Sequence, residues 1–418
     1  MLHRFTAYLV KIFDFPDWVD SLADERPYAR VPTANVWRSL FLLFVLRLGS
    51  FHALEQELRR PHRWERWIGR RKPSADTLRY ALERFDREAV RTMLSGVSRS
   101  AWRRKAIHLR PGERLRVVAL DGHELWASQH RCCPQCLERK VTVKKDGELE
   151  TVVEYYHRVV VAQWVGVTPP GILDLERVLP HEGEVVAARR LLQRILRNYS
   201  RLIDVVCGDA LYLEAPFITL VLDAGKHVVI TLKQEARDLY QDAEQLRSTV
   251  QPQVFTEGNK TTTMWDLSDL TTFTTLGKPM RVVWVVERTE RMEWRGKNKV
   301  PVVDEKTWIW VTDMPASFAS GKRIQRWGHD RWDIENRCFN ELSTLWGLDH
   351  CFAHEERAIE VLLLTLAIAF LTTYLFYERN LKPEGRVHMT RLALASRLPE
   401  DLAVPEHLEF WGCGSAPG

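Results

Sequence analysis

The chain has 418 residues, of which 45% are hydrophobic, and its formal net charge is +5. This length allows two to three domains with real cores, and the composition excludes an intrinsically disordered protein. Seven cysteines, an odd number, argue against the disulfide framework of a small secreted protein. No long apolar segment precedes a small-residue cleavage site at the N-terminus, so we expect a cytoplasmic protein.

The first part of the chain, residues 1–114, is predicted to be helical and basic. Ser74 is expected to cap a helix that begins after Pro73, in a pattern that suits a helix-turn-helix-like module. Two segments, 59–72 and 99–116, each carry many arginines and lysines against a single glutamate. A solvated helix face is the alternative, but two such patches favour a nucleic-acid partner. The candidate DNA contacts here are Arg59, Arg60, Arg70, Arg71 and Lys72.

From about residue 115 the pattern changes to alternating strands and helices. The predicted strands are Leu115–Leu120, Thr151–Val165, Ile172–Leu179, Asp204–Cys207 and His227–Leu232, and the predicted helices are Glu184–Tyr199 and Ala215–Ala224. Three strands, a helix, a strand, a helix and a strand is the order of a ribonuclease-H-like α/β core. We place the first part of this core at residues 115–234.

Residues 235–315 break this order and are predicted to form a β-rich insertion. Its alternating segments are Thr261–Leu267, Thr271–Leu276, Met280–Glu287 and Lys306–Thr312. Trp308 and Trp310 fall on one face of a strand, which suits a packed core, although tryptophans can also stack on unpaired bases.

The core is expected to resume over residues 316–380, with helices at Lys322–Trp346 and Ala358–Tyr377. The second of these is apolar and near the lower length limit of a membrane span. Three threonines interrupt it and no second span accompanies it, so we expect a buried packing helix and no membrane partner. Residues 381–418 are predicted to be a C-terminal tail with a short helix near 389–397.

Three acidic residues stand out by their contexts. Asp121 and Asp209 each end an apolar run, and Glu335 lies in a helical stretch. Asp121 could instead belong to a hairpin turn, Asp209 could cap a helix, and Glu335 could pair with Arg331 at i,i+4. Together, acids at the ends of neighbouring parallel strands and one on a flanking helix suit a magnesium ion, which takes oxygen ligands. Three carboxylates this close repel one another, so without metal we expect the site to be poorly ordered or partly protonated.

The segments Leu120–Glu124, Cys207–Tyr212 and Arg331–Glu335 resemble the three acidic motifs of bacterial insertion-sequence DDE transposases. The branch is the one with a β-rich insertion before the glutamate, and the resemblance spans roughly residues 115–375. It implies a ribonuclease-H-like catalytic core and cut-and-paste transposition of double-stranded DNA. Asp121, Asp209 and Glu335 would be the catalytic residues and would hold two Mg²⁺ (or Mn²⁺) ions.

The surroundings of Glu335 match this branch only in part. Arg331 matches its signature and could hold a phosphate, and we add Arg337 as a further candidate DNA contact. The tyrosine and lysine of the signature are replaced by Gly328 and Leu342. A hairpin intermediate on the transposon end therefore does not follow from the resemblance.

A cysteine motif lies between the first two predicted strands. Cys133 and Cys136 have the two-ligand spacing of a zinc knuckle, and Cys132, His123, His130 or His157 could complete the site. Our candidate zinc ligands are Cys132, Cys133, Cys136 and His157. Reduced thiols without metal are the alternative. A redox role fits less well, because the motif does not open a helix after a strand.

The sequence thus predicts a transposase that binds the terminal inverted repeats of its element, hydrolyses phosphodiesters and joins the ends to target DNA. Two ends must be held together, so we expect a homodimer on DNA, associated with the bacterial nucleoid. One rival is a ribonuclease-H-like nuclease without strand transfer. The other is a domesticated transposase that only binds DNA, against which the presence of all three acids argues.

Overall fold

The structure is a computed structural model, and it describes residues 1–60, 64–145, 147–235, 237–295, 298–382, 386 and 389–398. The chain divides into two units. The first comprises Met1–Gly112, Gly122–Ala187 and Asn336–Gly418, and the second comprises Glu113–Asp121 and Ala188–Glu335. Most of the predicted tail, 381–418, lies outside the described residues. The fold is mixed α/β with a large sheet that contains parallel and antiparallel pairs, which confirms the predicted α/β class.

Most of the first unit is helical. Its helices are α1 (Leu2–Phe13), α2 (Phe15–Asp20), α3 (Thr33–Val45), α4 (Phe51–Leu58), α5 (Glu65–Ile68), α6 (Ala75–Leu82), α7 (Arg87–Arg103), α12 (Asn340–Trp346), α13 (Glu356–Asn380) and α15 (Arg391–Arg397). Ser74 caps α6 as predicted, because its side chain accepts a hydrogen bond from the backbone N–H of Thr77.

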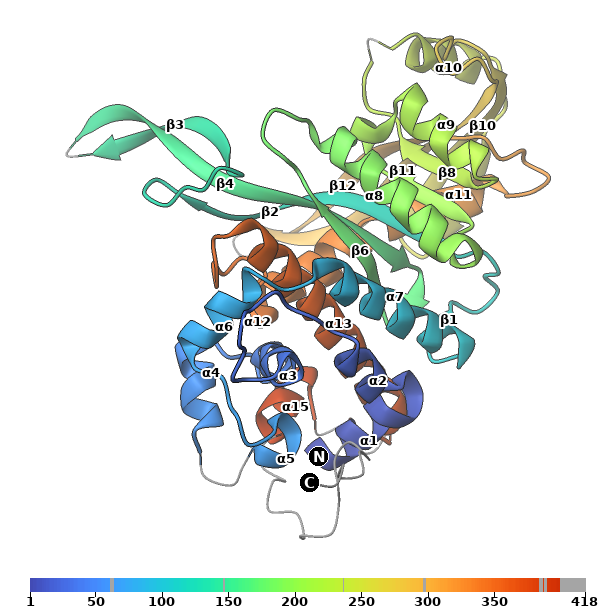
Figure 1. Ribbon diagram of the computed structural model, residues 1–418. Helices are drawn as coiled ribbons and strands as arrows, with labels where there is room; N and C mark the ends of the chain where they lie inside the picture. The colour runs from blue at the N-terminus through green and yellow to red at the C-terminus, as the bar shows by residue number, and fades with distance from the viewer. Residues whose placement is uncertain are drawn as a thin grey trace. The chain divides into compact units, whose positions relative to one another are not determined.

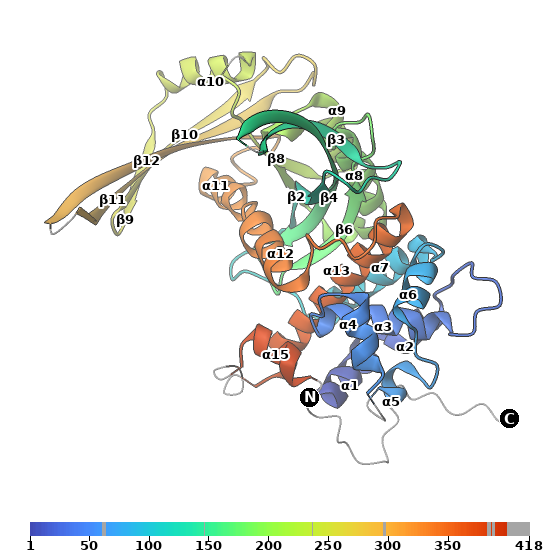
Figure 2. The same cartoon turned by 90° about the vertical axis from the view of Figure 1, so that its left-hand side faces the viewer.

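Helix α13 is the central helix of this unit, as Figures 1 and 2 show. It packs against α1, α3, α6, α7 and a strand, β6 (Gly171–Arg177). It is long and apolar enough to cross a membrane, but its apolar stretch is buried inside the protein. This is the packing role predicted for the segment. Its aromatic neighbours include Phe5, whose ring lies 5.1 Å from that of Phe376.

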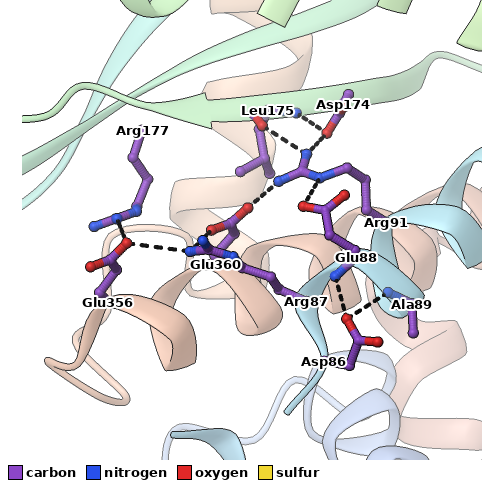
Figure 3. Close-up of polar contacts among 10 residues, drawn as sticks. All are labelled: Asp86, Arg87, Glu88, Ala89, Arg91, Asp174, Leu175, Arg177, Glu356 and Glu360. Carbon is purple, nitrogen blue, oxygen red and sulfur yellow. Dashed lines mark hydrogen bonds and ion pairs between the residues drawn. The ribbon is translucent and has the colours of Figure 1, made fainter. Parts of the chain in front are cut away.

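A network of ion pairs with a buried centre joins α7, α13 and β6 (Figure 3). At its centre Arg91, which is 4% exposed, donates to the carboxylates of Asp174 and Glu360 and to the carbonyl of Leu175 at 3.1 Å. Around it, Arg87 contacts Glu356 and Glu360, and Arg177 contacts Glu356. We call these residues the Arg91 network: Arg87, Arg91, Asp174, Arg177, Glu356 and Glu360. Buried charges are tolerated only when paired in this way.

The strands of the first unit form an antiparallel group. β3 (Leu137–Lys145) pairs with β4 (Glu148–Val165), and β4 pairs with β6 and with β2 (Val117–Ser128). The short strands β1 (His108–Leu109) and β5 (Val167–Thr168) pair with each other.

The second unit combines parallel and antiparallel strands. The early part of β2 pairs in parallel with β7 (Val205–Gly208), and β7 pairs in parallel with β8 (His227–Thr231). The antiparallel strands β12 (Asn298–Thr312), β11 (Met280–Arg295), β10 (Lys260–Leu270) and β9 (Gln253–Glu257) follow in that order from β8 (Figure 2). The helices of this unit are α8 (Glu184–Tyr199), which begins in the first unit, η1 (Ser200–Leu202), η2 (Ala210–Tyr212), α9 (Ala215–Asp223), α10 (Asp238–Arg247) and α11 (Gly321–Asp330).

The predicted strand Leu115–Leu120 begins at Val117 and runs on past Asp121 to Ser128. Two further predicted elements differ in kind from the structure. Thr271–Leu276 forms loop and turn rather than a strand. The predicted helix Lys322–Trp346 is divided into α11, a π-helix η3 (Ile334–Phe339) and α12. π-helical turns are uncommon and occur frequently at functional sites, and this one contains Glu335.

Candidate active site

Asp121 and Asp209 occupy equivalent positions on two neighbouring parallel strands. β2 and β7 pair with Ala119 opposite Cys207, and each aspartate follows its strand partner by two residues. Adjacent strands lie about 4.8 Å apart, so this register places the two acids at neighbouring positions of the sheet. β2 continues to Ser128, so the hairpin turn considered as an alternative for Asp121 is wrong.

Asp209 also caps a short helix. Its Oδ1 accepts a hydrogen bond of 2.9 Å from the backbone N–H of Leu211, at the start of η2. The capping role considered as an alternative is therefore observed. It leaves Oδ2 of the same carboxylate as a separate oxygen, so capping and metal ligation are compatible in this side chain.

Arg331 joins the two other acids. Its Nη1 donates to Oδ2 of Asp121 and to Oε1 of Glu335, both at 3.0 Å. The side chain is almost fully buried, with 4% of the residue exposed. The i,i+4 pair with Glu335 considered as an alternative is thus present. Because the same guanidinium also reaches Asp121, it gathers two carboxylates from elements far apart in the sequence.

The carboxylate of Asp121 has an unusual electrostatic environment. Burial raises its pKa to about 7, Arg331 opposes this shift, and the negative charges of Glu335 and Asp209 add to it. This agrees with the expectation that acids brought together without metal cannot all be charged. A carboxyl group that titrates near neutral pH is typical of a functional site.

The two signature positions that depart from the family have a structural explanation. Gly328 lies against Trp310, and a Cβ atom at position 328 would lie 2.1 Å from the Trp310 Nε1 atom. Trp310 is 2% exposed and stacks on Trp308, with ring centroids 6.2 Å apart. This confirms that the two tryptophans share a strand face, and it excludes a tyrosine at position 328. Leu342, at the lysine position, is a buried core residue.

The basic candidates lie mainly on the surface of the first unit. Arg70 and Arg71 are exposed and Lys72 is half-buried. Arg59 and Arg60 are exposed too, but they pair with Glu55 and Glu57, which offset part of their charge. Arg337 is an exposed residue of η3. The tryptophans within the first basic segment, Trp64 and Trp67, are buried in the helical core.

A second site belongs entirely to the first unit. Cys133, Cys136, His157 and His354 place one potential ligand atom each within 4.8 Å of the others, and we call them the cysteine–histidine cluster. Among the described residues, these four are the group of His, Cys, Asp and Glu side chains whose ligand atoms lie close enough together to hold a metal ion. Burial lowers the pKa of His157 to about 4, so its ring is neutral.

The cluster contains three of the four zinc ligands predicted from sequence. Cys132 is exposed and lies outside it, and His354 takes the fourth place. Sequence reasoning missed His354 because it lies far from the knuckle along the chain, where no spacing rule applies. The only available signal was the segment His350–His354, which contains two histidines and Cys351 directly before a predicted helix.

Comparison with known proteins points to one family. A family model described as a transposase DDE domain matches residues 172–372, slightly less than half of the chain. Asp209 and Glu335 lie inside the matched region, and Asp121 lies before it. A search of curated proteins gives no match. The match confirms the resemblance drawn from the acidic motifs and assigns the region to enzymes that move DNA. Residues 172–372 are therefore similar to the DDE domain of transposases.

Proposed function

We propose that Asp121, Asp209 and Glu335 form the catalytic triad of this transposase and hold two divalent ions, Mg²⁺ or Mn²⁺. The enzyme binds the terminal inverted repeats of its element, hydrolyses the phosphodiester at each end and transfers the exposed 3′ hydroxyls to target DNA. It works as a homodimer on DNA in the bacterial cytoplasm, associated with the nucleoid.

The observation that carries this proposal is the arrangement around Arg331. Asp121 and Asp209 have the same position on parallel strands, and Arg331 holds Glu335 and Asp121 within hydrogen-bond distance of one nitrogen. A chain order of β2, β4, β6, α8, β7, α9 and β8 also supports a ribonuclease-H-like core, with β3 and β5 added to it.

The donor set fits divalent ions. All three side chains offer hard oxygen ligands, and the shared guanidinium shows that Asp121 and Glu335 together accommodate positive charge. Bound ions would lower the pKa of the attacking water and stabilise the charge of an in-line displacement. Arg331 screens the repulsion between its two partners. Once they are neutralised by metal, its guanidinium is available to hold a DNA phosphate bidentately.

DNA binding is assigned to the helical region 1–114 and to the surroundings of η3. Arg70, Arg71 and Lys72 are the best candidates of the first region, since acids neutralise part of the charge of Arg59 and Arg60. Phosphate contacts of this kind position the DNA without reading its sequence. Arg337 would extend the contact near the catalytic glutamate.

The test uses purified full-length protein and a labelled duplex that carries the inverted repeat of the flanking element. We expect Mg²⁺- or Mn²⁺-dependent nicking at the repeat and joined products with a target plasmid. Asp209→Asn should abolish both while DNA binding persists. Asp223→Asn, which changes an exposed aspartate at the end of α9 in the same unit, should leave both intact.

Each rival predicts a different result. Cleavage without joined products would indicate a nuclease that lacks strand transfer. Binding of the repeat by a wild-type protein that neither nicks nor joins in either metal would indicate a domesticated DNA-binding protein. Equal activity of Asp209→Asn and Asp223→Asn would show that the triad is assigned wrongly.

A further inference from the structure

The cysteine–histidine cluster resembles a structural metal site in its residue types and in the close approach of its four side chains. Cys133 and Cys136 lie in the turn before β3, His157 lies on β4, and His354 lies two residues before α13. All four belong to the first unit, and none belongs to the acidic site. Two thiols and two imidazoles are the ligands of a closed Cys₂His₂ zinc site.

The distances agree with a tetrahedron around zinc. Bond lengths of about 2.3 Å to sulfur and about 2.0 Å to nitrogen require edges of roughly 3.8 Å for S···S and roughly 3.5 Å for S···N. The two sulfurs lie 3.6 Å apart, and each lies 3.5 Å from His157 Nε2. Cys136 Sγ lies 3.2 Å from His354 Nε2. These four edges therefore fit within about 0.3 Å.

The local backbone supports the same arrangement. The N–H of Cys133 points to the Sγ of Cys136 at 3.3 Å, and the N–H of Cys136 donates to the carbonyl of Cys133 at 3.0 Å. The first contact stabilises negative charge on the Cys136 sulfur, and the negatively charged thiolate is the form of cysteine that binds metal. Both thiols are free, so a disulfide does not explain their approach.

We infer that Cys133, Cys136, His157 and His354 bind one structural Zn²⁺ ion. Four protein ligands complete the tetrahedron and leave no position for a substrate, so the ion has no catalytic part. It ties the knuckle and β4 to the start of α13. His354 directly precedes Glu355, whose side chain caps α13 by accepting from the N–H of Ala358 at 2.9 Å. The zinc ion therefore anchors the first turn of the central helix.

The first experiment needs no variant. Full-length protein, produced without a metal-binding tag and dialysed, should contain one zinc per chain by plasma mass spectrometry. After removal of zinc and addition of Co²⁺, the spectrum should show the visible bands of tetrahedral cobalt and a thiolate charge-transfer band. Protein that contains no zinc and gives only an octahedral cobalt spectrum would overturn the inference.

The second experiment identifies the ligands. Cys136→Ser and His354→Ala should each reduce the zinc content at least tenfold. Cys132→Ser is the matched control, since it changes a neighbouring but exposed thiol outside the cluster and should retain one zinc. Zinc retained in His354→Ala and lost in Cys132→Ser would overturn the assignment. If a ligand variant does not fold, the cobalt spectrum of the wild type still decides the question.

Discussion

The Arg91 network allows a stability prediction with a worked magnitude. Arg91→Met keeps most of the side-chain volume but removes the cation that Asp174 and Glu360 share. Both acids are buried, with 1% and 8% exposure. Removing one partner of a buried ion pair costs about 3–5 kcal/mol, because the remaining charge is poorly compensated. The melting temperature of a unit of this size falls by about 2–4 °C for each kcal/mol of lost stability, so we expect a decrease of roughly 6–20 °C.

The assay is thermal unfolding of the full-length protein, followed by circular dichroism. Arg103→Met is the matched control, because it makes the same change at an exposed position of the same helix and should alter stability by less than about 0.5 kcal/mol. Asp174→Asn in the Arg91→Met background should recover part of the loss, since it removes the negative charge that Arg91 paired with. If Arg91→Met and Arg103→Met melt within 2 °C (about 1 kcal/mol) of each other, the network does not stabilise the protein as argued.

Three further predictions concern the site, a helix cap and DNA binding. Because the pKa of Asp121 is raised to about 7, a proton must leave before this carboxylate binds metal. The Mn²⁺ affinity measured by calorimetry should therefore fall about tenfold for each pH unit below 7 and level off above pH 7. An affinity that does not change between about pH 5.5 and 8 would contradict this. Ser74→Ala removes the cap of α6 and should cost about 1 kcal/mol in thermal unfolding, whereas an unchanged melting temperature would show that the cap does not contribute. Arg70→Ala and Arg71→Ala should each weaken the salt dependence of DNA binding, with the slope of log K against the logarithm of the salt concentration reduced by about 1. Unchanged slopes would exclude both residues as phosphate contacts.

Elements with a strong local period were predictable from the sequence. The helix Glu184–Tyr199 was predicted with the bounds it has, because apolar residues recur along it at helical spacing. The first four residues of β2, before Asp121, and the strand β7, before Asp209, are continuous apolar runs typical of parallel strands buried on both faces. The equivalent positions of the two acids follow from the pairing of these strands.

The remaining differences arise from tertiary contacts. No proline marks the break after α11, so its conversion to a π-helix at Ile334 has no local signal. The contact of Arg331 with Asp121 spans 210 residues, and that of Cys136 with His354 spans 218. Such partners are selected by the fold and not by spacing along the chain. Sequence patterns therefore singled out the acids, the knuckle and His157, but not the contact of Arg331 with Asp121 or the approach of His354 to Cys136.

The contact between Gly328 and Trp310 has a consequence for evolutionary change in this lineage. A larger side chain at position 328 and the indole at position 310 exclude each other, because their atoms would overlap. A larger residue at position 328 alone produces a clash, and a smaller residue at position 310 alone leaves a cavity, so each single change is expected to destabilise the protein. Relatives that carry tyrosine at position 328 should therefore carry a small residue at position 310, and the two positions should vary together.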